Sequence, residues 1–242
     1  MHFPKTAEAF GTVSKHLANW RFQGRIPFNR FVDSTRWYHG KRTFDDLEEA
    51  LSDTVETYRK NLWREQRNLV EIWVEKEAVA SIVSPVGNSW GIRTFPCRGF
   101  ASITSTWEAA ETFKAAIEAG KEPVILYLGD HDESGYKIDR AIFEKHFKHY
   151  GIRDLVDFRR VAILPEQIEK FNLPTRPSKT EWDGGDCVEI DTLSSEEIRT
   201  LLEDEIKALI SPREWNQLRA IETEERDTGV SILAAYQRNH RG

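Results

Sequence analysis

Two aspartates follow a short apolar run that is typical of a buried strand. Residues 124–128 are all apolar, and Asp130 and Asp132 come soon after them. A continuous run of this kind is typical of a strand that is covered on both faces of a parallel sheet. Ligands bind beyond the carboxyl ends of the strands in such sheets, and carboxylate oxygens are ligands that Mg²⁺ prefers. The pair therefore predicts a divalent-cation site and metal-assisted phosphate chemistry.

A second strand end carries two more acids. Residues 69–74 predict a strand, and Glu75 and Glu77 follow it. Neighbouring parallel strands bring their carboxyl ends together, and carboxylates that cluster there repel one another unless a cation neutralises them. We therefore predict a shared site for Mg²⁺ or Mn²⁺. Its predicted catalytic and metal-binding residues are Glu75, Asp130 and Asp132. Glu77 is a weaker candidate for a further metal ligand, and the alternative is an acid in the first turn of the next helix.

The elements around these acids alternate between strand and helix. The expected strands are residues 69–74, 91–96, 124–128 and 158–164, and the expected helices between them are residues 78–85, 107–118 and 134–148. This alternating order predicts an α/β fold with a Rossmann-like, mostly parallel sheet and helices on both of its faces.

Helical segments precede the predicted sheet. Residues 6–22 have apolar side chains at helical spacing, and a second amphipathic helix is expected over residues 44–65. Thr43 is the expected N-cap of the second helix, with Asp46 three residues further on. We interpret the apolar stripe of this helix as part of the core.

A long polar loop and further helices follow the sheet. Residues 171–186 are rich in proline and glycine and exceed the length that packing needs, which favours a functional loop. A capping-box pattern at Ser194 predicts a helix, and Pro212 predicts the start of another, with a frayed tail after Tyr236. We divide the chain into three parts, which are residues 1–66, 67–170 and 171–242.

The charge is distributed unevenly. Residues 1–42 hold eight Lys and Arg against two acids, whereas the whole chain has a net charge of −6. A basic segment on an acidic body predicts contact with a polyanion such as DNA, and a solvated basic face without a partner is the alternative. The candidate DNA-binding residues in this segment are Arg21, Arg25, Arg30, Arg36, Lys41 and Arg42.

The composition narrows the class of protein. The 242 residues include no apolar run long enough for a membrane span and no signal-like N-terminal segment, so we expect a cytoplasmic protein with no membrane partner. Cys97 and Cys187 are the only cysteines, and we interpret them as reduced structural thiols. Most of the eight tryptophans fall in apolar patterns and are predicted to belong to the core.

Three other interpretations of the Asp-x-Asp motif remain open. It resembles the start of a calcium-binding EF-hand loop, but the twelfth position of that loop is Ala141 rather than glutamate. It also resembles the opening motif of haloacid-dehalogenase phosphatases, in which the first aspartate is a nucleophile, although Ser134 matches that motif loosely. The third interpretation is a solvated acidic loop that caps the following helix.

The spaced motifs together resemble a Toprim domain. Glu-Lys follows the first strand, a glycine-containing loop follows the second, and Asp-x-Asp-x-x-Gly follows the third. The likeness covers about residues 68–165 and is strongest to the A subunit of topoisomerase VI and its meiotic double-strand-break relatives. It implies that Glu75 contributes to metal binding and proton transfer, and that Asp130 and Asp132 bind Mg²⁺.

The resemblance also implies contact with DNA. Residues 21–36 look like the end of a winged-helix region, and Arg98, beside the turn glycine Gly99, is placed to meet a phosphate. The family cleaves DNA with a tyrosine in an upstream segment that this sequence does not match, and we interpret Tyr38 as an ordinary aromatic. Glu133 replaces a proline of the family. Covalent strand cleavage by this chain alone is therefore not expected.

Two functions follow from these observations. The first is a Mg²⁺-dependent DNA-processing protein, a nuclease in which Glu75 assists proton transfer. The alternative is a DNA-binding or regulatory module that performs no chemistry without a partner. The family resemblance further implies a homodimer or a partner subunit. Four other charged residues flank or follow the long loop. They are predicted to be surface or capping groups, with a place in the same crevice as the alternative, and these are Glu166, Lys179, Glu189 and Asp191.

Overall fold

The protein forms two compact units. The computed structural model describes residues 7–27, 30, 42–97, 103–178 and 182–240, and the units are Met1–Thr43 and Phe44–Gly242. In the first unit, helix α1 (Ala7–Phe22) agrees with the predicted helix. None of the described helices is long and apolar enough to cross a membrane.

The second unit is built on a sheet of four parallel strands in the order β2-β1-β3-β4. The strands are β1 (Asn68–Val74), β2 (Arg93–Pro96), β3 (Glu122–Leu128) and β4 (Asp157–Ala162). Strands β1 and β3 are neighbours along their full length, and their last residues, Val74 and Leu128, are paired. The predicted α/β fold with a parallel sheet is confirmed.

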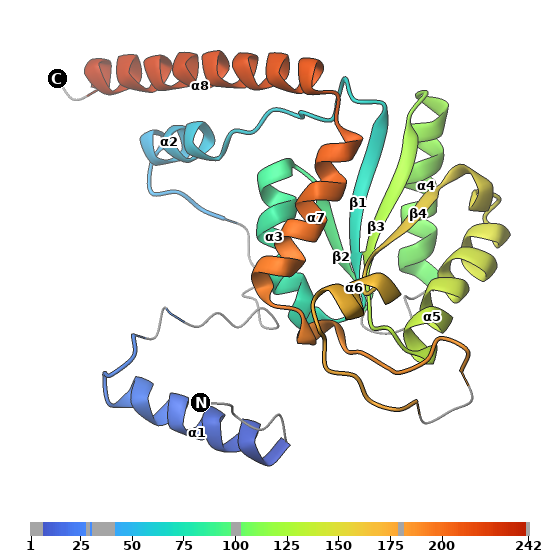
Figure 1. The fold of residues 1–242 in the computed structure, drawn as a ribbon. Coiled ribbons are helices and arrows are strands. Elements are labelled where there is room, and N and C mark those ends of the chain that lie inside the picture. The colour runs from blue at the N-terminus through green and yellow to red at the C-terminus, as the bar shows by residue number, and fades with distance from the viewer. Residues whose placement is uncertain (1–6, 28–29, 31–41, 98–102, 179–181, 241–242) are drawn as a thin grey trace. The chain divides into compact units, whose positions relative to one another are not determined.

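Helices cover both faces of this sheet, as Figure 1 shows. Helices α3 and α7 pack on one face, and α4 and α5 pack on the other. The helices of this unit are α2 (Leu47–Thr57), α3 (Glu77–Trp90), α4 (Ile103–Glu118), α5 (Glu133–Arg140), α6 (Pro165–Lys170), α7 (Ser195–Leu209) and α8 (Pro212–His240). Helix α5 continues without a break as a π-helical turn at Ala141–Phe147.

Alternate side chains of the central strands form two separate cores. In β3, Val124, Leu126 and Leu128 belong to the core under α3 and α7, whereas Ile125 and Tyr127 belong to the core under α4 and α5. This division follows from the strand period of two residues. Burial on both faces explains why the strand appears in the sequence as an unbroken apolar run.

Helix α2 differs from its prediction at both ends. Asp46, not Thr43, is the N-cap, because its side chain accepts a hydrogen bond of 2.8 Å from the backbone N–H of Glu49. The helix ends at Thr57, where the following residue has an extended backbone. None of its residues is fully buried, so the interpretation of its stripe as core is wrong, and the helix packs beside α8 instead.

Other predicted boundaries also shift. Helix α3 contains Pro85 and runs to Trp90, beyond the predicted end, and the following strand is correspondingly shorter. Helix α8 continues past Tyr236 to His240 as regular helix, so the predicted frayed tail is wrong over these residues. The capping box at Ser194 is confirmed, because Ser194 and Glu197 each bond the other's backbone N–H.

The cysteine and tryptophan predictions are largely confirmed. Cys97 and Cys187 are both free and buried. Trp63, Trp73 and Trp215 are buried in the cores. Among the described tryptophans, the exceptions are Trp20 on α1 and Trp107 on α4, which are 40% and 49% exposed, and Trp182, which belongs to neither core.

Candidate metal centre

The carboxyl ends of β1 and β3 bring Glu75 against the backbone of Asp130. The backbone N–H of Glu75 donates to the carbonyl oxygen of Leu128 at 2.9 Å, which extends the strand pairing by one residue. The Oε2 atom of Glu75 then accepts a hydrogen bond of 2.9 Å from the backbone N–H of Asp130. Residues that follow two neighbouring strands, and that lie far apart in the sequence, therefore meet at the carboxyl end of the sheet.

Glu75 lies in a tightly enclosed position. Burial raises its pKa to about 7, although its hydrogen bond from Asp130 acts in the opposite direction. A Cβ atom at Gly129 would lie 2.8 Å from Glu75 Oε2 and 2.7 Å from a ring carbon of Tyr127. A Cβ atom at Gly135 would overlap the carbonyl oxygen of Asp130. Both positions require glycine because the backbone passes so close to these groups.

Three carboxylates converge beside Glu75. Asp130, Asp132 and Glu189 each offer an oxygen atom, and these oxygens lie within 4.8 Å of one another. We call this group the acid cluster. Two of the carboxylates also have structural roles. Asp132 Oδ1 caps α5 by accepting from the N–H of Gly135 at 2.8 Å, and Asp130 Oδ1 accepts from the N–H of Ile190 at 2.9 Å.

A pairing between distant segments brings Glu189 into the acid cluster. His131 and Val188 form an antiparallel bridge, with two backbone hydrogen bonds of 2.9 Å. The predicted long loop is therefore anchored at its end to the Asp-x-Asp segment. Of the two interpretations of Glu189, the structure agrees with the alternative that it lines the crevice. The sequence favoured a surface or capping role because an isolated bridge leaves no periodic pattern.

Two basic side chains neutralise much of the acid cluster. Lys76 Nζ lies 2.8 Å from Asp130 Oδ2 and also pairs with Glu189. Arg176 lies 2.8 Å from Glu189 and 3.4 Å from Asp132. The hydrogen bond from Lys76 lowers the pKa of Glu189 to about 2. The cluster thus holds three carboxylates and two cations from the chain itself.

Arg160 supports the backbone of the site. It donates to the carbonyl oxygens of Gly129 and Asp130 at 3.1 and 3.0 Å, and it pairs with the half-buried Asp139 at 2.7 Å. These bonds position the turn that presents the first aspartate. Lys76 belongs to the Glu-Lys motif that follows β1, but the sequence gives it no role at the site. Nothing in the sequence marks Arg160, which becomes a neighbour of Asp130 through the pairing of β3 with β4.

The donor set of the acid cluster fits a hard divalent cation. Mg²⁺ takes one or two protein carboxylates and completes its octahedron with water and phosphate oxygens. Oxygens of Asp130, Asp132 and Glu189 are of this kind and lie close enough to share one ion. Neither Glu75 nor Glu77 belongs to the cluster among the described residues, and Glu77 is the first residue of α3.

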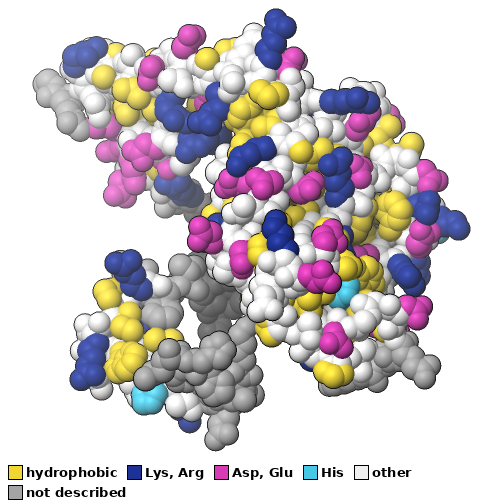
Figure 2. Space-filling view, in the orientation of Figure 1, with side chains coloured by type: hydrophobic (Ala, Val, Ile, Leu, Met, Phe, Trp, Pro, Cys, Tyr) yellow, Lys and Arg dark blue, Asp and Glu magenta, His cyan; other side chains and the backbone are white. Residues whose placement is uncertain are grey.

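The remaining predicted site residues lie elsewhere. Arg21, Arg25, Arg30 and Arg42 belong to the first unit, and Glu166 and Asp191 are exposed surface residues, as predicted. Figure 2 shows Lys and Arg intermixed with Asp and Glu on the visible face of the second unit. The predicted residues outside the described ranges are Arg36, Tyr38, Lys41, Arg98, Gly99 and Lys179.

Comparison with protein-family models, curated proteins and solved structures finds no match to this chain.

Proposed function

We propose that this protein is a Toprim-like, Mg²⁺-dependent enzyme that cleaves phosphodiester bonds of DNA. The observation that carries the proposal is the acid cluster at the carboxyl end of a parallel sheet, with Glu75 beside it. This is the position at which open α/β sheets bind ligands. The basic N-terminal segment supports DNA as the substrate, since phosphate contacts depend on Lys and Arg.

The acid cluster and Glu75 have separate roles in the proposed reaction. Asp130, Asp132 and Glu189 would hold Mg²⁺ or Mn²⁺. The bound ion would polarise the scissile phosphate and lower the pKa of a water nucleophile. Glu75, whose pKa is raised to about 7 by burial, is suited to accept and release a proton near neutral pH.

Lys76 and Arg176 contribute to the same site from the protein side. Both are fixed by carboxylates of the acid cluster, and each has further N–H donors. In the proposed reaction these side chains orient the phosphate and stabilise the charge that develops on it.

A specific observation favours the alternative of a non-catalytic DNA-binding or regulatory module. The ammonium of Lys76 contacts Asp130 at 2.8 Å and Glu189 as well, so part of the acid cluster is already neutralised without a metal. In that case the acid cluster would serve to anchor the long loop.

Cleavage of supercoiled plasmid by the full chain distinguishes the two functions. We expect nicking with Mg²⁺ or Mn²⁺ that EDTA abolishes, and a loss of about 100-fold or more for Asp130→Asn. Glu189→Gln should show a similar loss, and it keeps the test valid if the buried aspartate variant does not fold. Asp204→Asn, an exposed change on α7, is the charge-matched control. DNA binding without nicking would support the non-catalytic module, and nicking that both site variants retain would contradict the proposed enzyme.

A further inference from the structure

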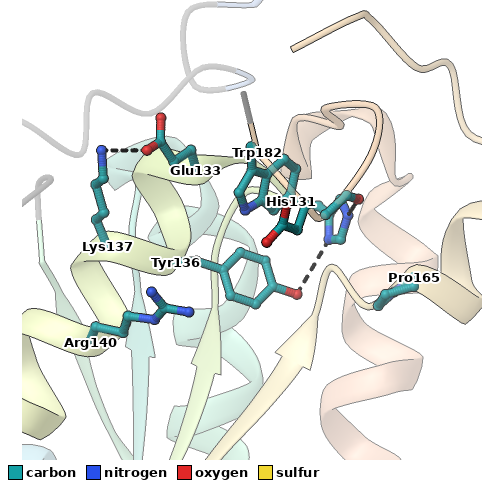
Figure 3. Close-up of a pocket in the computed structure, with 9 residues that line it drawn as sticks. His131, Glu133, Tyr136, Lys137, Arg140, Pro165 and Trp182 are labelled. Atoms are coloured by element: carbon teal, nitrogen blue, oxygen red, sulfur yellow. Dashed lines mark hydrogen bonds and ion pairs between the residues drawn. The ribbon is translucent and has the colours of Figure 1, made fainter. Parts of the chain in front are cut away.

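A pocket lies beside the acid cluster in the second unit. It has a volume of about 530 Å³, which is typical of small-ligand sites. Its walls come from α5, from Pro165 at the start of α6, and from the loop that carries Trp182. Figure 3 shows Tyr136 and His131 directed toward each other within the pocket, with Trp182 beside them. We call it the aromatic pocket.

Three aromatic rings form one wall of the aromatic pocket. The ring centroid of His131 lies 4.9 Å from that of Trp182 and 5.6 Å from that of Tyr136. The rings are held in place: His131 Nε2 is 3.0 Å from the carbonyl oxygen of Gly184, and Arg160 lies over the Tyr136 ring at 4.2 Å. Preorganised aromatic rings of this kind are the surfaces on which unpaired bases stack.

Helix α5 supplies cations to the same pocket. Arg140 is exposed, and among the residues that the structure describes it makes no ion pair with a carboxylate. Lys137 pairs with Glu133 at 2.6 Å, and this pair is weak because the Lys137 side chain is largely exposed to solvent. A phosphate can contact Arg140 directly and compete with Glu133 for Lys137.

Two carboxylates of the aromatic pocket influence which charge state of a phosphate it can bind. Glu133 and Asp183 also line the pocket, so it holds two cations and two carboxylates. This balance disfavours a phosphate dianion and is compatible with the single charge of a phosphodiester. The pocket is therefore better suited to a nucleotide within a strand than to a free nucleoside monophosphate.

The aromatic pocket and the acid cluster lie on opposite sides of one segment. His131 stands between Asp130 and Asp132 and is paired with Val188 in an antiparallel bridge. Successive side chains of an extended segment point to opposite faces, so the His131 ring points away from the neighbouring carboxylates. A base in the pocket and a phosphate at the acid cluster would consequently belong to different nucleotides of the same strand.

We propose that the aromatic pocket binds an unpaired nucleotide of a single DNA strand. The base stacks on Trp182 and Tyr136, and its phosphodiester contacts Arg140. The choice of DNA rests on the proposed function, but binding in the pocket requires no metal. It would hold one nucleotide of the strand while a neighbouring phosphate lies at the acid cluster.

The test is fluorescence anisotropy with a labelled oligothymidylate of about ten nucleotides and the full chain in EDTA. We expect Trp182→Ala to weaken binding about 5- to 100-fold, the range for loss of one stacked base. Arg140→Gln should weaken it several-fold. Two controls match these changes outside the pocket: Trp107→Ala removes an exposed tryptophan from α4, and Lys145→Gln removes a cation from the turn after α5. Both should bind within about twofold of the wild type.

Competition by unlabelled nucleic acids tests whether the ligand is an unpaired nucleotide within a strand. Unlabelled single strand should displace the probe better than thymidine monophosphate or blunt duplex. Equal competition by the duplex would overturn the proposal, since a paired base cannot enter the pocket, as would Trp182→Ala and Arg140→Gln behaving like their controls. Equal competition by the monophosphate would overturn the assignment to a strand. Glu189→Gln should still bind in EDTA, because binding in the pocket requires no metal. If the wild-type chain does not nick plasmid but Trp182→Ala and Arg140→Gln still weaken binding, the result contradicts the proposed nuclease alone.

Discussion

At the scale of single residues, ionisation of the buried Glu75 lowers the stability of the folded protein. Its pKa is raised from 4.5 to about 7 by burial, so the folded state binds this proton more tightly than the unfolded state. Burial of Glu75 therefore has little effect on stability below pH 4.5, and it opposes folding increasingly between pH 4.5 and 7. Above about pH 7 the full penalty applies.

Glu75→Gln should stabilise the metal-free protein in a pH-dependent manner. The amide oxygen can still accept the hydrogen bond from Asp130, but the buried charge is gone. In EDTA at pH 8 we expect the free energy of unfolding to rise by up to about 3 kcal/mol, and the gain to fall below about 1 kcal/mol near pH 5. Urea unfolding of both proteins at pH 5 and pH 8 measures this difference in the free energy of unfolding. An increase of the same size at both pH values would contradict the prediction.

Gly135 is required by the close approach of the Asp130 carbonyl. Gly135→Ala should lower the free energy of unfolding by about 1–3 kcal/mol, because the added methyl group forces α5 away from the turn. Ser134→Ala, an exposed change at the preceding position, is the control and should have an effect below about 0.5 kcal/mol. Equal melting temperatures for the two variants would contradict this prediction, because the turn would then accommodate the methyl group without loss of stability.

Sequence reasoning identifies part of this site and misses the rest for a physical reason. Asp130 and Glu75 are found because each follows a strand whose apolar pattern is visible in the sequence. Arg176 is not found, and Glu189 is expected in the crevice only as an alternative to a surface or capping role. Both reach the acid cluster through bridges made by an irregular loop. Local periodicity carries no information about such pairings.

At the scale of elements, α7 shows which sequence signals were reliable. Its capping box at Ser194 and its apolar spacing both predicted a helix, and its inner side chains are fully buried against the sheet. The predicted helix is also found at α2, but the interpretation of its stripe as core is wrong although its spacing is equally regular. Spacing indicates which face is apolar but not what covers it, and α2 packs beside α8 rather than on the sheet.

Two adjacent leucines on α7 test this account of packing. Leu202 is fully buried in the core, whereas Leu201 only borders it. Leu202→Ala should lower the free energy of unfolding by about 2–5 kcal/mol, and Leu201→Ala by less than half of that value. The two changes remove the same atoms and have the same helix propensity, so their difference reports burial alone. Denaturant titrations that give equal values would contradict the assignment of the inner face.

At the scale of the whole molecule, charge is divided between the two units. The segment before residue 43 is basic and the remainder is acidic. A basic segment that contacts phosphates should make DNA binding steeply dependent on salt, with little preference for sequence.

Arg25→Gln combined with Arg30→Gln should weaken duplex binding and make it less sensitive to salt. If both side chains contact phosphates, the slope of log K against log salt should decrease in magnitude by about 2. Lys207→Gln with Arg213→Gln makes the same charge change on the acidic unit and should leave the slope unchanged. The comparison requires binding isotherms at several salt concentrations, and equal slopes for the two double variants would exclude a specific role of the N-terminal segment.

The most direct test of the metal centre is a crystal of the full chain soaked in Mn²⁺ and measured at the manganese absorption edge. The account predicts an anomalous peak among the carboxylates of Asp130, Asp132 and Glu189, with the ammonium of Lys76 displaced from at least one of them. The account would be contradicted if, at saturating Mn²⁺, no peak were found at the acid cluster and Lys76 were still bound between Asp130 and Glu189.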